Sequence, residues 1–392
     1  MGFAPFLAWT GFIVIFTPNT GLMVRNIGYA FWLCFNVLLV FATVQLFDTP
    51  EKIRKLCQVY LFSFFAMSLF GLVQFAIPLI GGPGIYVEQW FIQDKVARVN
   101  GFSYEPSYYA TYLLTGWCLH MYLIEVKHSW FNQKFLKTSL FFITIGMVLS
   151  TSRMGWLFLV VWFLRFPLMI LINFVRGELK KIHLYYLLGV SGLIASLVLF
   201  VYAFIGFDNL EIIFAGLGIM DTSAHSSATR WEGMLDTLEV FLKSPLIGYG
   251  LGGISYAIGN LNGIKVDSLE LAKLYEGVCI YAEVLAASGF VGFLFFIYYQ
   301  FVLIYRPLKL ALQTRSQDFK YLLKGLMYSF LFLLAILQLN QNILRPYFWM
   351  HVAIISAAYY CTKQLEWQKQ KTIQEVHVEP VNLSSTTEKI FT

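Results

Sequence analysis

Long apolar runs alternate with short polar connections along almost the whole chain. A helix needs about 20 apolar residues to cross the hydrocarbon core of a bilayer. The pattern predicts an all-α polytopic membrane protein with about ten transmembrane helices. The first run is short and flanked by Pro5 and Pro18, so it is expected to be a tilted span or a re-entrant helix. The runs cover 3–17, 27–47, 56–80, 106–125, 136–150, 154–174, 184–206, 279–305, 322–341 and 344–361.

The distribution of lysine and arginine predicts the orientation of these helices. Cytoplasmic connections are enriched in basic residues, and with a cytoplasmic N-terminus the non-cytoplasmic side holds only nine of the 28. Those nine are Arg25, Arg98, Arg153, Arg230, Arg345, Lys95, Lys243, Lys265 and Lys273. Both termini are therefore predicted to be cytoplasmic.

Four segments follow from this topology. Residues 1–206 hold the first seven predicted transmembrane helices, and 207–278 form one large loop on the non-cytoplasmic (periplasmic) side. Residues 279–362 hold the last three helices. Residues 363–392 are polar and aperiodic, which is typical of a disordered cytoplasmic tail.

Composition supports a membrane protein and excludes several other classes. The chain is 58% hydrophobic and 13% charged, with a mean hydropathy of +0.66, whereas about a quarter of the residues in a soluble domain are charged. The net charge of +6 follows from topology and indicates no nucleic-acid partner. The five cysteines lie in or beside the apolar runs without CxxC spacing, so neither a disulfide framework nor a zinc site is predicted.

The large loop contains the string "SSATRWEGMLDTLEVFLKSPLIGYGLGG", which predicts an amphipathic helix. Ser226, Ser227 or Thr229 can cap its start, and Lys243 to Pro245 end it. Its apolar residues recur at helical spacing, so the helix is expected to lie on the membrane surface or to cap a transmembrane cavity. These apolar residues are Trp231, Met234, Leu235, Leu238, Phe241 and Leu242. The glycines that follow belong to no strand–loop–helix unit, so a nucleotide site is not predicted.

Arginines stand at several non-cytoplasmic helix ends. Arg98 and Arg153 lie in short connections, and Arg230 falls in the first turn of the amphipathic helix, where exposed amides favour an anion. The planar guanidinium suits bidentate contact with phosphate. Each arginine could instead reach ordinary lipid phosphates. Arg153 fits that alternative least, because "STSRMG" joins two apolar runs with no room for a solvated loop.

Glu105 is the carboxylate of greatest interest. Pro106 favours a helix start, which places Glu105 near an N-cap at the membrane boundary, where it could accept a proton from a hydroxyl. Tyrosines suited to stacking on sugars surround it: Tyr104, Tyr108, Tyr109 and Tyr112. A simple capping glutamate in an interfacial aromatic belt is the alternative. Glu283 could pair with an arginine on the non-cytoplasmic side or act as an alternative base. His351, Arg345 and the "QLNQN" string could line the same cavity or form interhelical hydrogen bonds.

Several short motifs occur in the order found in one enzyme family. They are "SR" at Ser152 and Arg153, "RW" at Arg230 and Trp231, then "SPLIGYGLG" and "ASGFVGFLFF". Together with "RVNGFSYEPSYYATYL", the stretch from about Arg98 to Tyr299 resembles the O-antigen polymerase and ligase superfamily. The resemblance implies a GT-C-like fold in the bacterial inner membrane. It also implies glycan transfer from an undecaprenyl-pyrophosphate carrier at the periplasmic face.

Carried over position by position, the resemblance implies that Arg98, Arg153 and Arg230 hold the pyrophosphate and that Glu105 lies near the reacting sugar. Glu232 or Glu276 could replace Glu105 as the base. Ligases carry a histidine before the "E.G..G" span, and "YEGVCIYAEVLAASGFVG" has none, which favours a polymerase. No metal and no cofactor are expected, because arginines stabilise the departing pyrophosphate. A polysaccharide chain-length regulator is an expected partner.

Two alternatives remain open. A ligase would transfer the glycan to lipid A core. A transporter or flippase of lipid-linked oligosaccharide would normally show charges along a mid-membrane path and an internal repeat, and the sequence shows neither.

Overall fold

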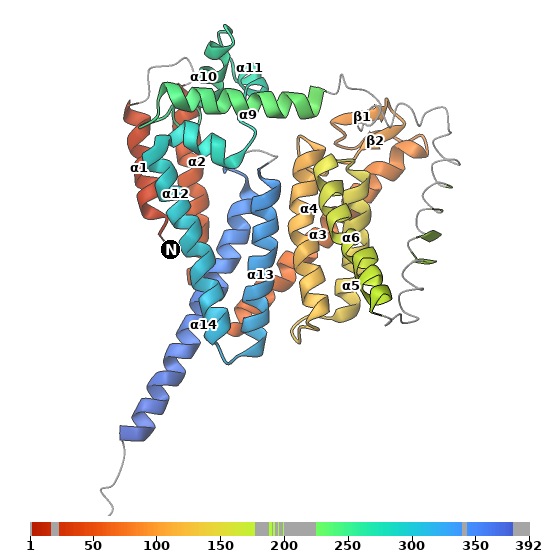
Figure 1. The fold of residues 1–392 in the computed structure, drawn as a ribbon, viewed down its shortest axis with the longest axis vertical. Helices are drawn as coiled ribbons and strands as arrows, with labels where there is room; N and C mark the ends of the chain where they lie inside the picture. Colours follow the sequence, from red (N-terminus) through yellow and green to blue (C-terminus); the bar gives the residue numbers. More distant parts are fainter. Residues whose placement is uncertain are drawn as a thin grey trace, which may run out of the picture.

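Helices build almost all of the computed structural model, which describes residues 2–16, 23–176, 225–338 and 343–378, with single positions between 188 and 199. The helices of the main bundle are α1 (Ala4–Phe16), α2 (Met23–Leu46), α3 (Pro50–Leu79), α4 (Pro106–Glu125), α5 (Gln133–Leu149), α6 (Arg153–Val175), α12 (Ile280–Gln313), α13 (Gln317–Ile336) and α14 (Pro346–Val378) (Figure 1). They coincide with nine of the predicted runs. Most of the remaining run, 184–206, lies outside the described residues.

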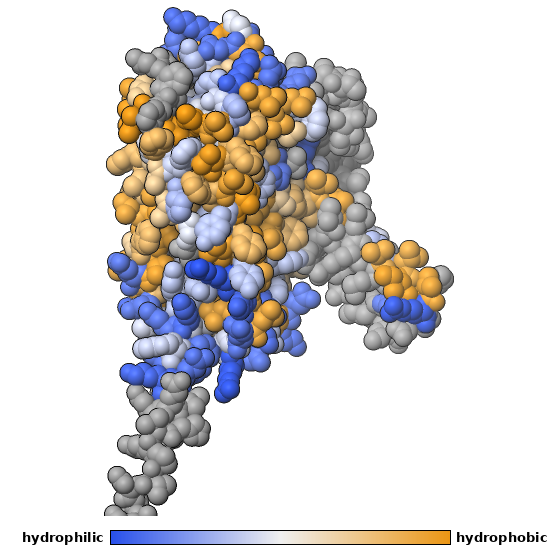
Figure 2. All heavy atoms as spheres, turned by 60° about the vertical axis from the view of Figure 1, so that its left-hand side comes forward, coloured by the Kyte–Doolittle hydropathy of each residue, from blue (hydrophilic) through white to orange (hydrophobic). Residues whose placement is uncertain are grey.

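The bundle has the surface of a membrane protein. On the face drawn in Figure 2, apolar side chains cover the middle of the bundle and polar side chains gather at its two ends. Four of the described helices, α2, α3, α12 and α13, are long and apolar enough to cross a bilayer. Helix α1 has 13 residues, a length of about 20 Å, so it is too short to cross about 30 Å of hydrocarbon alone. The described helices and their apolar composition confirm the prediction of a mostly helical membrane protein.

Helix α4 lies at the centre of the bundle. Fifteen of its 20 residues are buried, and it packs against α3, α5, α6 and α13. Its contact with α3 is so close that a side chain at Gly116 would overlap the ring of Phe64. Trp117 is also fully buried and donates a hydrogen bond to Thr144 of α5 at 2.9 Å. The middle of α4 is therefore held closely by α3 and α5.

One end of the bundle carries a hairpin and three helices outside the main bundle, and we call this end, including the helix starts that lie there, the α9 face. The hairpin is β1–β2 (Gln89–Ile92 and Val96–Arg98), and the helices are α9 (His225–Lys243), α10 (Ile254–Leu261) and α11 (Leu269–Leu274) (Figure 1). The hairpin was not predicted. The helix predicted between Ser226 and Lys243 is confirmed as α9.

Only part of the apolar stripe of α9 docks on the bundle, through Phe241, which packs against the core. Thr237 and Val240 are fully buried, and Gly233 would contact Val278 if it carried a side chain. Trp231 and Leu242 are instead 62% and 70% exposed. The helix was expected either to lie on the membrane surface or to cap a transmembrane cavity. The exposed apolar side chains favour contact with the membrane surface.

Helix α12 is broken at Gly289, which has a φ of 64° and a ψ of −177°. The segment after α9 pairs with the broken backbone. The amides of Tyr249 and Gly250 donate to the carbonyls of Ala286 and Ala287, and Phe290 donates to Pro245. Trp9 donates to the carbonyl of Ser288. The "GYGLGG" glycines therefore serve close backbone packing, and they let α9 be fixed to α12.

The C-terminal segment differs from the prediction. Residues 363–392 were expected to be disordered, but α14 continues as a helix to Val378. Thr314 donates to the carboxylate of Glu366 at 2.6 Å, which joins this extension to the α12–α13 connection. The polar composition was therefore compatible with a solvated helix as well as with a disordered chain. Residues 379–392 lie outside the described part.

Candidate functional site at the α9 face

Glu105 is the N-cap residue of α4, as the Pro106 pattern predicted. Its backbone is extended (φ −128°, ψ 143°), and its side chain makes no capping hydrogen bond. The carboxylate instead accepts a hydrogen bond from the Ser107 hydroxyl at 2.9 Å. Glu105 is half-buried. Its carboxylate is thus free of the capping role that was the alternative explanation for this residue.

The hairpin brings Arg98 to the start of α6. Arg98 donates from Nη1 to Gln89, its partner in the strand register, at 2.7 Å, and from Nε to the Thr151 hydroxyl at 3.1 Å. Thr151 lies two positions before Arg153, the first residue of α6. Two of the three predicted phosphate-binding arginines therefore lie on adjoining segments, although they are 55 positions apart in sequence.

The first turns of α6 also adjoin α4. A side chain added at Gly155 would stand 3.2 Å from the β-carbon of Ala110, so the α6 start lies beside the α4 start, where Glu105 is the N-cap. Arg153 is half-buried and has no ion pair or hydrogen bond from its side chain within the described ranges. Arg98, Arg153 and Glu105 thus belong to one region of the α9 face.

A buried polar network fixes the hairpin. Gln74 of α3 accepts from the amides of Asn100 and Gly101 and donates to the carbonyls of Ile85 and Tyr86. Asn100 donates to the carbonyl of Ser103 at 2.6 Å. Both side chains are almost fully buried, so removing either would leave backbone groups without partners. This network, which the sequence did not suggest, positions Arg98.

The predicted tyrosines divide into two groups. Tyr109 donates to the Met67 carbonyl at 3.1 Å, and Tyr112 pairs with Ser63 at 2.7 Å, so both are tied to α3. The prediction that these two surround Glu105 is wrong, because their positions on α4 point them into the bundle. Tyr104 is exposed and lies under the ammonium group of Lys273, 5.5 Å from its ring centroid.

Tyr108 contacts Arg345, the residue before α14. The guanidinium carbon of Arg345 lies 3.6 Å from the ring centroid of Tyr108, a cation–π contact. The Nε of Arg345 is buried and has no hydrogen-bond partner among the described residues. Tyr108 is also within electrostatic range of Glu105 and Glu276. This side of α4 therefore carries a second cation close to the predicted base.

Glu276 is bound to a different arginine. Arg25 in the first turn of α2 forms an ion pair with Glu276 at 2.5 Å and donates to Tyr29, Ser255 and the Gly252 carbonyl. This pair is buried and joins the large loop to α2. Glu276 could therefore act as a base only if this pair were broken. Arg25 is 227 to 251 positions away from Gly252, Ser255 and Glu276 in sequence, so spacing could not have indicated these partners.

The remaining candidates are less closely grouped. Glu283 is buried in the first turn of α12, within electrostatic range of Tyr29 on the Arg25 side. His351 bridges Tyr60, Ser329 and the Leu326 carbonyl, so it makes interhelical hydrogen bonds. Glu232 is exposed on α9. Arg230 lies in α9, but its side chain falls outside the described residues, so its predicted role stays a prediction.

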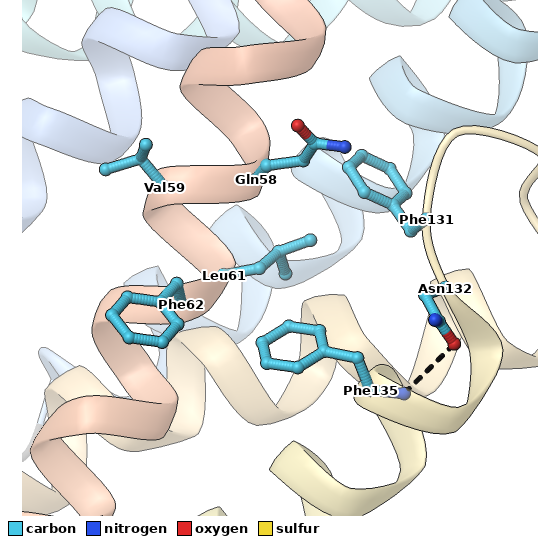
Figure 3. A pocket seen from close by; sticks show the side chains of 7 residues that line it. All are labelled: Gln58, Val59, Leu61, Phe62, Phe131, Asn132 and Phe135. Atoms are coloured by element: carbon cyan, nitrogen blue, oxygen red, sulfur yellow. Dashed lines mark hydrogen bonds between the residues drawn. The ribbon is translucent and has the colours of Figure 1, made fainter.

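A cavity of about 350 Å³ lies elsewhere, between α3 and the start of α5 (Figure 3). Its lining residues are Gln58, Val59, Leu61, Phe62, Phe131, Asn132 and Phe135. None is charged, and Asn132 is occupied in capping α5 through the amides of Lys134 and Phe135. This cavity has no group for acid–base or phosphate chemistry.

Comparison with known proteins assigns no family and no chemistry to these residues. A scan against protein-family models and a search of curated proteins returned no match for this chain. Family membership therefore stays a prediction based on the short motifs.

Proposed function

We propose that this protein is a membrane glycosyltransferase that elongates a polysaccharide. It would move a growing glycan from undecaprenyl pyrophosphate to a lipid-linked repeat unit at the α9 face. That face would be the periplasmic side of a bacterial inner membrane, with both termini cytoplasmic and about ten helices in a GT-C-like arrangement. The product would belong to O-antigen or lipopolysaccharide biosynthesis, with a chain-length regulator as partner.

The observation that carries the proposal is the grouping of Arg98, Arg153 and Glu105 at one end of an apolar bundle. A cation held beside the hydrocarbon core is costly unless it has an anionic partner. Arg153 has no carboxylate partner among the residues described. A diphosphate at the membrane boundary would supply that charge, and its prenyl chain would remain in the bilayer.

The proposed reaction needs two groups from the protein. The acceptor sugar hydroxyl attacks the anomeric carbon of the donor, the bond from that carbon to the phosphate oxygen breaks, and the diphosphate leaves with both bonding electrons. Glu105 accepts the hydroxyl proton. The arginines stabilise the negative charge that develops on the leaving diphosphate. Arg98 would contribute through its electrostatic field, since its hydrogen bonds to Gln89 and Thr151 already fix its position.

Purified protein in liposomes, given a synthetic undecaprenyl-diphosphate-linked repeat unit, tests this proposal. The wild-type protein should produce a ladder of longer glycans on a gel. Arg153→Ala and Glu105→Gln should each reduce the rate at least ~100-fold, in the range of lost charge stabilisation or acid–base catalysis. Arg54→Ala and Glu51→Gln are matched controls, because both residues are exposed at the opposite face. Wild-type rates in both site variants would refute the assignment.

The same assay separates the alternatives. Transfer of a preformed glycan to lipid A core, without elongation, would indicate a ligase. Movement of the oligosaccharide across the bilayer without elongation would indicate a flippase. The break in α12 is reminiscent of the discontinuous helices of transporters. The carbonyls of Ala286, Ala287 and Ser288 are nevertheless occupied by Tyr249, Gly250 and Trp9, so they offer no ion site.

A further inference from the structure

The starts of α4 and α14 have the same local sequence pattern with opposite charges. Glu105 precedes Pro106 at the start of α4, and Arg345 precedes Pro346 at the start of α14. Tyr108 is close to both, because Arg345 covers its ring at 3.6 Å and Glu105, three positions before it, is within electrostatic range. The two helix starts thus bring a cation and a carboxylate close to one tyrosine side chain.

Two polar atoms at the start of α14 are buried without partners in the described part of the chain. They are Nε of Arg345 and the hydroxyl of Tyr347. Arg345 lies within electrostatic range of the hydroxyls of both Tyr347 and Tyr108. No carboxylate among the described residues forms a salt bridge with Arg345. Burying a donor without an acceptor is unfavourable, and an arginine and a tyrosine side by side suit an oxyanion.

This place is distinct from the region of Arg98 and Arg153. Arg345 contacts Tyr108, whereas the α6 start contacts Ala110. Two positions along a helix correspond to a rotation of about 200°. The two cationic regions therefore flank α4 on opposite sides, with Glu105 at the helix start between them.

We infer that Arg345 and Tyr347 form a second diphosphate subsite, on the opposite side of α4 from Arg153. This inference rests on the proposed function, in which the donor and the acceptor are both lipid-linked diphosphates. One subsite would hold the leaving diphosphate of the donor. The other would anchor the acceptor lipid, whose diphosphate is retained, so that its sugar reaches Glu105.

Binding of farnesyl diphosphate to the purified protein in neutral detergent, measured by calorimetry, tests the subsite without requiring turnover. The wild-type protein should bind two molecules per chain and Arg345→Gln one. Tyr347→Phe keeps the ring beside Tyr112 and should weaken one of the two sites about tenfold, since a hydrogen bond to a charged group is lost. Arg54→Gln, at the opposite face, should bind as the wild-type protein does.

Competition identifies the chemistry of the ligand. Inorganic pyrophosphate should displace farnesyl diphosphate from the Arg345 site, because the diphosphate is the recognised group. Phosphatidylglycerol should not displace it at equal concentration. Equal displacement by phosphatidylglycerol would show an ordinary lipid contact and overturn the inference, and so would an Arg345→Gln variant that titrates like the wild-type protein.

The outcomes for the subsite and for the proposed function are separable. If Arg345→Gln loses one site but the wild-type protein elongates no glycan, the subsite stands and the proposed reaction falls. If the wild-type protein elongates glycans and Arg345→Gln still binds two diphosphates, the reaction stands and the subsite falls.

Discussion

Arg25 and Arg345 lie at the same end of the bundle and each lies over a tyrosine ring, but they differ in whether the described residues supply a carboxylate partner. Arg25 is buried, pairs with Glu276 and makes three further hydrogen bonds. Arg345 has an aromatic ring for a partner and a buried Nε without an acceptor among the described residues. The comparison teaches that position at the membrane boundary does not make an arginine a ligand-binding residue. The decisive property is whether the protein already supplies its counter-charge.

The largest expected effect is the loss of stability on replacing Arg25, whose guanidinium already has a carboxylate partner. Arg25→Gln should lower the free energy of unfolding by about 3–5 kcal/mol, because it leaves the Glu276 carboxylate buried without its cation. Thermal unfolding of the purified protein in detergent measures this change. A variant as stable as the wild-type protein would show that the Arg25 network is not structural.

Removing both charges should restore much of that loss. Arg25→Gln with Glu276→Gln leaves no uncompensated charge, and two amides can still hydrogen-bond across the loop–α2 contact. We expect the double variant to be more stable than Arg25→Gln alone by at least about 1 kcal/mol. Equal stabilities of the single and double variants would contradict an interaction between these two side chains.

Arg345 should behave in the opposite way. Arg345→Gln removes a cation–π contact, for which about 1 kcal/mol of stability is expected. The elongation rate, in contrast, should fall at least about tenfold, as expected for loss of a charged contact to a bound diphosphate. Unfolding and elongation measured on the same preparation separate the two roles. A large loss of stability with an unchanged elongation rate per folded molecule would show that Arg345, like Arg25, has a structural role and does not bind the diphosphate.

The smallest expected effect is the pH dependence of stability caused by His128. It sets the pH range in which the Arg25 and Arg345 variants should be compared. His128, in the connection between α4 and α5, donates from Nε2 to the Asp318 carbonyl and accepts at Nδ1 from the Trp130 amide. Burial lowers the pKa of His128 below its ordinary value of 6.5, although the Asp318 carbonyl and charge oppose this. Below about pH 6.5 the unfolded chain binds the proton more readily, so stability should fall as the pH decreases.

His128→Gln removes the titrating group and should flatten this part of the stability profile. Thermal unfolding between pH 5 and pH 8 measures the difference. The same acid-induced loss in the variant and the wild-type protein would assign it to another group. Above pH 6.5, effects at the α9 face can be compared without this contribution from the opposite face.

The helices could be predicted from the sequence because they depend on local composition. Runs of apolar residues and the Glu105–Pro106 boundary are read within one segment, and α4 begins where that boundary predicts. The hairpin before α4 was missed because its strands are short and are held by Gln74 and Asn100, whose partners include backbone groups 11 and 14 positions away. The helical extension of α14 was missed because polar composition does not distinguish a solvated helix from a disordered chain.

The site could be predicted only in part, because its contacts join distant segments. The sequence indicated Glu105, Arg98 and Arg153, which stand beside proline or at tight turns. It could not show that Glu276 is paired with Arg25. Tyr347 was missed, although the pattern of a charged residue before proline at the starts of both α4 and α14 could have drawn attention to it.

Locating the bound diphosphate tests the central claim most directly. A photoreactive analogue of farnesyl diphosphate, crosslinked to the purified protein, can be mapped by mass spectrometry of the labelled peptides. The account predicts labels at the starts of α4, α6 and α14, near Glu105, Arg153 and Arg345. Labelling confined to the cavity between α3 and α5 at Phe62 and Phe135, with none at the α9 face, would contradict it.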